Sequence, residues 1–79
     1  MSRSRLHLSF PEPLVGRPVI YEAANRFGVV PNIRRANVEE HVGWMVCELG
    51  GENKAVERSV EWLRDLGVQV DRLGDVVES

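Results

Sequence analysis

Residues that could catalyse a reaction or bind a metal are few and scattered in this 79-residue chain. His7 and His41 have no cysteine, histidine or carboxylate at metal-ligand spacing, which argues against a metal site. The single Cys47 falls on the predicted core face of a strand, where no base can be placed beside it, and is interpreted as a small buried apolar residue. No glycine-rich phosphate-binding pattern occurs. We therefore expect no catalytic residues, no metal, no cofactor and no enzymatic activity.

Arg34 and Arg35 are the candidate anion-binding residues, because a guanidinium group pairs well with a carboxylate. They lie in a segment rich in β-branched residues at 29–38, where Pro31 removes a backbone donor and favours the edge of a sheet. Strand alternation sends the two arginines to opposite faces, so only one of them can serve a given site. The alternative is that both are edge charges that deter aggregation between strands.

Four strands and two helices are predicted to position these residues. Alternating apolar residues predict a strand over residues 5–10, and apolar residues spaced three and four apart predict helices over 18–27 and 53–66. Gly28 and Gly67 end the helices, and further strands follow over 29–38, 43–49 and 68–70. This β-α-β-β-α-β order predicts an α+β ferredoxin-like sandwich, a four-stranded antiparallel sheet with both helices on one face. The predicted spatial order is fourth, first, third and second strand, which makes residues 29–38 an outer strand.

The face of the sheet opposite the helices is predicted to be more apolar than a solvated face should be. Alternation, with Ile33 taken as pointing to the core, assigns to this open face Asn32, Arg34, Ala36, Val38, Trp44 and Val46. We interpret Trp44 and Val46 as part of an interface or pocket. The alternative is that Trp44 only shields its own sheet beneath the stem of a neighbouring arginine.

Length and composition indicate a small globular protein. With 43% hydrophobic and 28% charged residues, the chain lies outside the range of disordered proteins. We expect one domain over residues 1–79, with its core at about 5–73 and a polar tail at 74–79. So short a chain buries only about 60% of its unfolded surface, so we predict a homodimer, for which the outer strand offers unpaired backbone groups.

Charge and hydropathy argue against nucleic acid and membranes as partners. The formal net charge is -2, although residues 1–38 hold six basic and two acidic side chains and the remainder four and ten. RNA-binding modules of this topology stack bases on aromatic residues of the first and third strands, whereas here only Trp44 and His7 are available. No apolar run approaches the roughly 18 residues of a membrane helix, and no secretory signal is present. We expect a cytoplasmic protein without nucleic-acid binding or membrane insertion.

Several short motifs occur in an order and spacing that resemble the NIL domain, a small regulatory module known from the C-terminus of methionine-importer ATPases. They are Phe10-Pro11, Pro18, Phe27-Gly28-Val29, Asn32-Ile33, Gly43 to Gly51, and Leu63 to Val68. The resemblance covers about residues 5–73. It departs from the family at Arg34, where the Asn-Ile-Leu triplet has an apolar third residue.

The resemblance implies a non-enzymatic, homodimeric regulatory module that binds methionine or a related sulfur amino acid. The ligand-binding residues would be Asn32, Ile33, Arg34, Ala36 and Val38, with Asn32 hydrogen-bonded to the ligand and Arg34 paired with its carboxylate. The alternative is an accessory subunit that binds no small molecule and docks onto a partner, an enzyme of homocysteine or methionine synthesis or a transporter.

Overall fold

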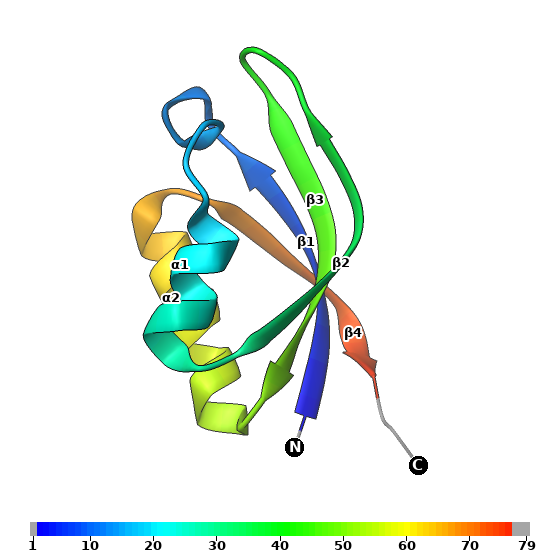
Figure 1. The fold of residues 1–79 in the computed structure, drawn as a ribbon. Coiled ribbons are helices and arrows are strands. Elements are labelled where there is room, and N and C mark those ends of the chain that lie inside the picture. The colour runs from blue at the N-terminus through cyan, green and yellow to red at the C-terminus, as the bar shows by residue number, and fades with distance from the viewer. Residues whose placement is uncertain (1, 77–79) are drawn as a thin grey trace.

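The structure is a computed structural model that describes residues 2–76 of the chain. Its elements are β1 (Ser2–Phe10), a short 3₁₀ turn (Glu12–Leu14), α1 (Val19–Phe27), β2 (Val30–Val38), β3 (Gly43–Gly51), α2 (Asn53–Leu66) and β4 (Gln69–Val76). Both helices lie on one side of the sheet (Figure 1), and the other face is left open. The predicted ferredoxin-like α+β sandwich is confirmed.

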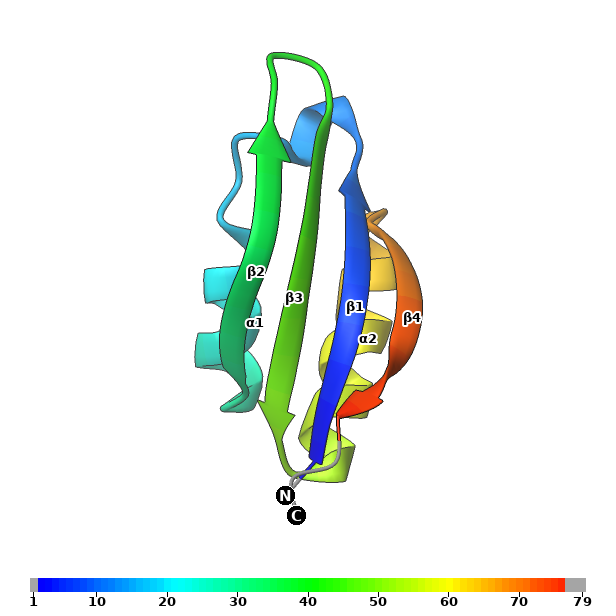
Figure 2. The same ribbon diagram turned by 90° about the vertical axis from the view of Figure 1, so that its right-hand side faces the viewer.

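The four strands form one antiparallel sheet in the order β2-β3-β1-β4 (Figure 2), as predicted. The two central strands pair along their whole length, with Leu6 opposite Cys47 and Leu8 opposite Met45. Strand β2 is at one edge of the sheet, and all of its residues from Asn32 to Val38 are exposed. The backbone of this strand is therefore open to a partner or ligand along its outer side.

The core lies between the sheet and the two helices. From the strands and the segments next to them it takes Leu6, Leu8, Val29, Cys47, Leu49, Val68 and Val70, and from the helices Val19, Ile20, Val56, Val60 and Leu63. Each helix ends where predicted, because Gly28 and Gly67 adopt the left-handed conformation with φ of 72° and 107°. These two corners direct the chain back into β2 and β4.

The strands are longer than the apolar pattern predicts. Strand β1 begins at Ser2, and β3 continues to Gly51. Strand β4 continues to Val76, so the prediction of a polar tail is wrong for residues 74–76, which pair with β1. Residues 77–79 of that predicted tail lie outside the described residues. Polar strand ends of this kind are held by backbone pairing, which leaves no apolar periodicity in the sequence.

Candidate functional site

Strand β2 contains a β-bulge at Arg34. Ile33 lies opposite Cys47 of β3, and Arg35 lies opposite the preceding residue of β3, Val46. Arg34 is therefore an extra residue in β2 without an opposite residue of its own. Because opposite residues of paired strands share a face of the sheet, the bulge shifts the alternation of β2 by one residue after Ile33.

The predicted placement of Ala36 and Val38 on the open face is wrong for this reason. Ala36 lies opposite Met45 and Val38 lies opposite Gly43, so both belong to the face that the helices cover. Trp44, which was predicted to share a face with them, lies on the opposite side of the sheet. It pairs with Ser9 of β1, one position from the core-facing pair of Met45 and Leu8, and therefore faces away from the core. The six residues predicted to form one surface are thus divided between two faces.

Both arginines lie on the open face, so the prediction that alternation sends them to opposite faces is also wrong. Arg35 lines a hollow on the open face together with Trp44 and Val46. Arg34 is close enough to Glu48, another open-face residue of β3, to influence the ionisation of its carboxyl group. The bulge gives β2 two consecutive cations on this face.

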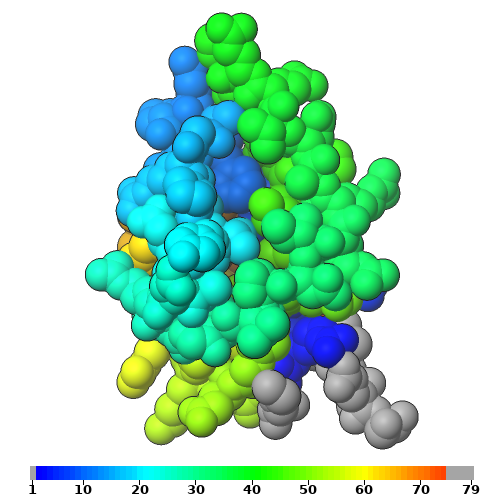
Figure 3. Space-filling model, in the orientation of Figure 1, coloured from blue at the N-terminus to red at the C-terminus, as the bar shows by residue number. Residues whose placement is uncertain are grey.

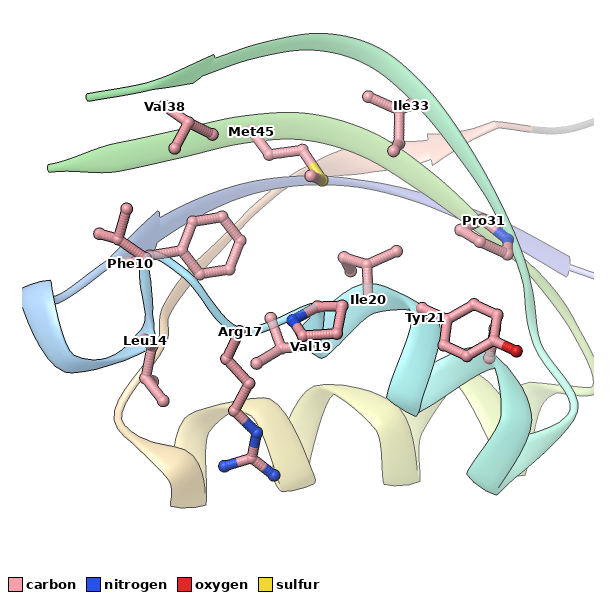
Figure 4. Close-up of a pocket in the computed structure, with 13 residues that line it drawn as sticks. Phe10, Leu14, Arg17, Val19, Ile20, Tyr21, Pro31, Ile33, Val38 and Met45 are labelled. Carbon is pink, nitrogen blue, oxygen red and sulfur yellow. The ribbon is translucent and has the colours of Figure 1, made fainter. Parts of the chain in front are cut away.

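On the helix side, an apolar groove runs between α1 and β2 (Figure 3), with a volume of about 510 Å³. Its lining residues are Phe10, Leu14, Val15, Arg17, Pro18, Val19, Ile20, Tyr21, Ala24, Pro31, Ile33, Val38 and Met45. Phe10, Ile20, Ile33, Val38 and Met45 point into it from both sides (Figure 4). The groove exists because the helices leave the β2 end of the sheet uncovered.

Two predicted ligand residues lie in this groove and remain accessible. Ile33 is 53% exposed and Val38 is 63% exposed, which is unusual for apolar residues on the covered face of a sheet. Tyr21, at 67% exposure, stands at the rim. A groove of this kind can hold an apolar side chain of a ligand or partner.

The one charged residue in the lining is turned away from the groove. Arg17 points away from the other lining residues (Figure 4), and its Nε and a terminal nitrogen donate to Glu22 at 2.7 and 2.8 Å. This hydrogen bond, with a smaller contribution from the charge of Arg17, lowers the pKa of the Glu22 carboxyl. The surface of the groove is therefore almost entirely apolar.

The open face carries a second, more polar hollow around Trp44. Its volume is about 400 Å³, and it is lined by His7, Ser9, Phe10, Arg35, Val42, Gly43, Trp44 and Val46. The rings of His7 and Trp44 stack with centroids 5.8 Å apart and an angle of 13° between their planes. The open-face placement of Trp44 and Val46 agrees with the prediction.

Beside this hollow, the carboxylate of Glu48 is buried on a face that is otherwise open. Its side chain is 4% exposed, and one of its oxygens accepts hydrogen bonds from Arg5 at 2.9 and 3.2 Å. The other oxygen lies 3.8 Å from Arg3 and accepts a 3.5 Å hydrogen bond from the Asn32 amide nitrogen. The Arg5 hydrogen bonds, and then the charges of Arg5, Arg34 and Arg3, lower the pKa of the Glu48 carboxyl, although burial opposes the shift.

The burial of Glu48 was not predicted from the sequence. Strand pairing puts Arg5 directly opposite Glu48 on one side and Asn32 directly opposite it on the other. A carboxylate between an arginine and an asparagine of the two adjacent strands is well supplied with hydrogen-bond donors. The signal for the burial of this carboxylate is therefore the pairing of the three strands. No periodicity within a single strand reveals it.

Cys47 is fully buried on the helix face, as predicted. Burial, with a smaller contribution from the charge of Glu48, raises the pKa of its thiol to about 11. At neutral pH the sulfur is therefore a protonated thiol, a poor nucleophile. Within residues 2–76, no helix is both long and apolar enough to cross a membrane.

The order of the elements, the edge position of β2 and the Asn32-Ile33 motif together define a small ferredoxin-like domain with an exposed edge strand. The chain belongs to the NIL domain family, whose model matches residues 4–72. The family resemblance seen in the sequence is thereby confirmed.

Comparison with known proteins gives one curated relative and several similar structures. The chain is 36% identical over 75 residues to the methionine import ATP-binding protein MetN of Photorhabdus laumondii subsp. laumondii, covering 90% of this chain and 22% of that protein. The C-terminal domain of an ABC transporter ATP-binding protein from Enterococcus faecalis is similar in structure, with a TM-score of 0.77, 23% identity, and coverage of 90% of this chain and 83% of that one. Prephenate dehydratase from Streptococcus mutans matches with a TM-score of 0.61 and 20% identity over 94% of this chain and 42% of that chain. At these identities the two structures show the fold alone.

Proposed function

We propose that this chain is a non-enzymatic regulatory module that binds methionine or a related amino acid with an apolar side chain. The observation that carries this proposal is the apolar groove beside Asn32-Ile33, the family motif, on an exposed edge strand. Membership of the NIL family, and similarity to a protein named for methionine import, support this class of ligand.

The ligand would cross the edge of β2. Its side chain would lie in the groove against Ile33 and Met45, where it is removed from water at a gain of about 0.8 kcal/mol per methylene. Its charged groups would reach the other side of the strand, where Asn32 and Arg34 are exposed. Consecutive Cα atoms are only about 3.8 Å apart, so one amino acid can contact Ile33 and both of its neighbours. Ala36 and Val38 contribute to the groove side and not to the charged end.

We further propose that the module is a homodimer whose protomers meet on the β2 side. Val38 and Tyr21 expose most of their apolar surface there, and the outer backbone groups of β2 face away from the sheet. A second copy would cover part of a bound ligand, so ligand binding and association would be linked. Sedimentation at tens of micromolar, with and without methionine, tests this part independently. A monomer under both conditions would contradict it.

Calorimetry against a panel of amino acids tests the ligand. Ile33→Asp places a charge in the groove and should lower methionine affinity at least tenfold, because the carboxylate must be desolvated when the thioether enters. Val30→Asp is the matched control: Val30 is on the same strand, is 63% exposed, and pairs with Gly50 two positions from the Asn32–Glu48 pair, which places it on the open face. Equal losses in both variants would contradict the groove as the side-chain site.

A second candidate function is an accessory subunit of an enzyme of sulfur amino acid metabolism. The hollow at Trp44 and Val46 favours it, because an aromatic stack beside Arg35 is the type of surface enriched in protein interfaces. Under this alternative, Trp44→Ala would abolish association with the partner enzyme, and Ile33→Asp would leave it unchanged. Under the ligand-binding function, the two variants would show the reverse pattern in methionine titrations.

A further inference from the structure

Burial of the Glu48 carboxylate costs free energy of desolvation. A carboxylate that is 4% exposed loses most of its hydration, and its ion pairs with Arg5 and Arg3 only offset this loss. A neutral residue of similar size would fill the same space without the desolvation penalty. Because a buried ion pair is weak evidence for stability, the network calls for a role beyond holding β1 against β3.

The contact between Glu48 and Asn32 fixes the orientation of an amide. An ionised carboxylate only accepts hydrogen bonds, so the Asn32 group 3.5 Å from its Oε1 has to be the amide nitrogen. The carbonyl oxygen of Asn32 lies in the same plane at the other end of the amide, and the Glu48 carboxylate has no donor for it. Asn32 is exposed on the edge strand, so a ligand can reach this side chain.

We infer that Glu48 is a positioning residue that orients Asn32, so that the Asn32 carbonyl oxygen accepts a hydrogen bond from the α-ammonium group of a bound amino acid. This inference rests on the proposed amino-acid-binding function. The charges near the site agree with it, since Arg34 is exposed and lies near Glu48, where it can pair with the ligand's carboxylate. The site therefore selects free amino acids over carboxylic acids that lack an amine.

The test compares methionine with 4-(methylthio)butanoate, which has the same side chain and carboxylate but no ammonium group. Glu48→Leu releases Asn32 and should lower methionine affinity roughly tenfold or more, the range for a hydrogen bond to a charged group. Affinity for the analogue should stay within about twofold of its wild-type value, because the analogue makes no such bond. Glu48→Gln keeps an acceptor for the amide nitrogen and should recover most of the methionine affinity.

Three results would overturn the inference. Equal losses for both ligands would mean that Glu48 only supports the fold, and an unchanged methionine affinity in Glu48→Leu would mean that it orients nothing. If the wild-type protein binds no amino acid, the proposed function itself fails and this role of Glu48 fails with it. Should Glu48→Leu not fold, NMR of the wild-type Asn32 side-chain amide decides the matter: amide protons that exchange with solvent as fast as those of an unstructured peptide would also exclude the contact.

Discussion

Raising the pH should destabilise this protein through Cys47, and the size of the effect follows from burial of the thiol. The side chain is fully buried between Leu6 of β1 and Ile33 of β2, and its pKa rises from 9.0 to about 11. The folded state thus retains a proton that the unfolded chain releases above pH 9. The stability linked to this thiol is therefore complete below pH 9 and is lost as the pH rises toward 11.

With pKa values of 9.0 unfolded and about 11 folded, the loss between pH 8 and pH 10 amounts to about 1 kcal/mol of unfolding free energy. Urea denaturation followed by circular dichroism at the two pH values measures it. Cys47→Ala is the reference, because it keeps every other titrating group and lacks only the thiol. For each protein, the free energy of unfolding at pH 10 is subtracted from that at pH 8. The cost of the cavity in Cys47→Ala is the same at both pH values and drops out of this difference.

An equal pH-dependent loss in wild type and Cys47→Ala would refute this reasoning. A second measurement addresses reactivity directly: at pH 8 a disulfide reagent should label Cys47 no faster than the protein unfolds. Faster labelling of the native state would reveal an accessible thiolate. It would also reopen the possibility of a catalytic cysteine, which both the sequence and the buried position of Cys47 argue against.

Two further predictions concern charged residues of the open face. Arg34→Leu should lower the affinity for an amino acid by about 1.5 to 3 kcal/mol, the range for a charge-assisted hydrogen bond, whereas Arg35→Leu should change it little; calorimetry compares the two. Higher methionine affinity in Arg34→Leu would instead favour a blocked ligand site and the accessory-subunit function. Glu48 has a lowered pKa, so its stabilisation is present above the unfolded pKa of about 4.5 and is lost as the pH falls through the folded value. Acid titration should therefore destabilise wild type more than Glu48→Gln below pH 4.5, and parallel curves would contradict the ion pairs.

The architecture was predictable because each element carries a local signal. Apolar spacing marks the helices, Gly28 and Gly67 mark their ends, and alternation marks β1. The chirality of the two crossovers then leaves few possible strand orders, so the edge position of β2 followed without any long-range information. The long polar ends of the strands carry no such signal, and the prediction cut β1, β3 and β4 short.

The candidate site was only partly predictable, because it depends on how strands pair. Asn32, Arg34, Trp44 and Val46 were placed on the correct face by counting alternation from an inward residue. One extra residue in β2 then invalidated the same count for the remainder of the strand. The burial of Glu48 needed the register of three strands at once, which a single sequence does not provide.

The bulge also determines the chemistry of the groove, and deletion of Arg34 tests this. In a regular strand, alternation from Ile33 would direct Arg35 and Asn37 into the groove, where an unpaired guanidinium would cost several kcal/mol. With the bulge, Ala36 and Val38 occupy the groove side and the polar residues face solvent. Arg34 itself is exposed and lacks an opposite residue on β3.

Removing Arg34 should therefore leave the pairing of Arg35 with Val46 intact and change the unfolding free energy by less than about 1 kcal/mol. Amino-acid affinity should fall as it does in Arg34→Leu, because the same cation is lost. Contacts across β2 and β3, read from NMR, should still pair Ala36 with Met45. If β2 were instead regular, the deletion would reverse the faces of every later residue in the strand. Loss of the Ala36–Met45 contact, or a destabilisation of several kcal/mol, would show that the groove does not depend on a bulge at this position.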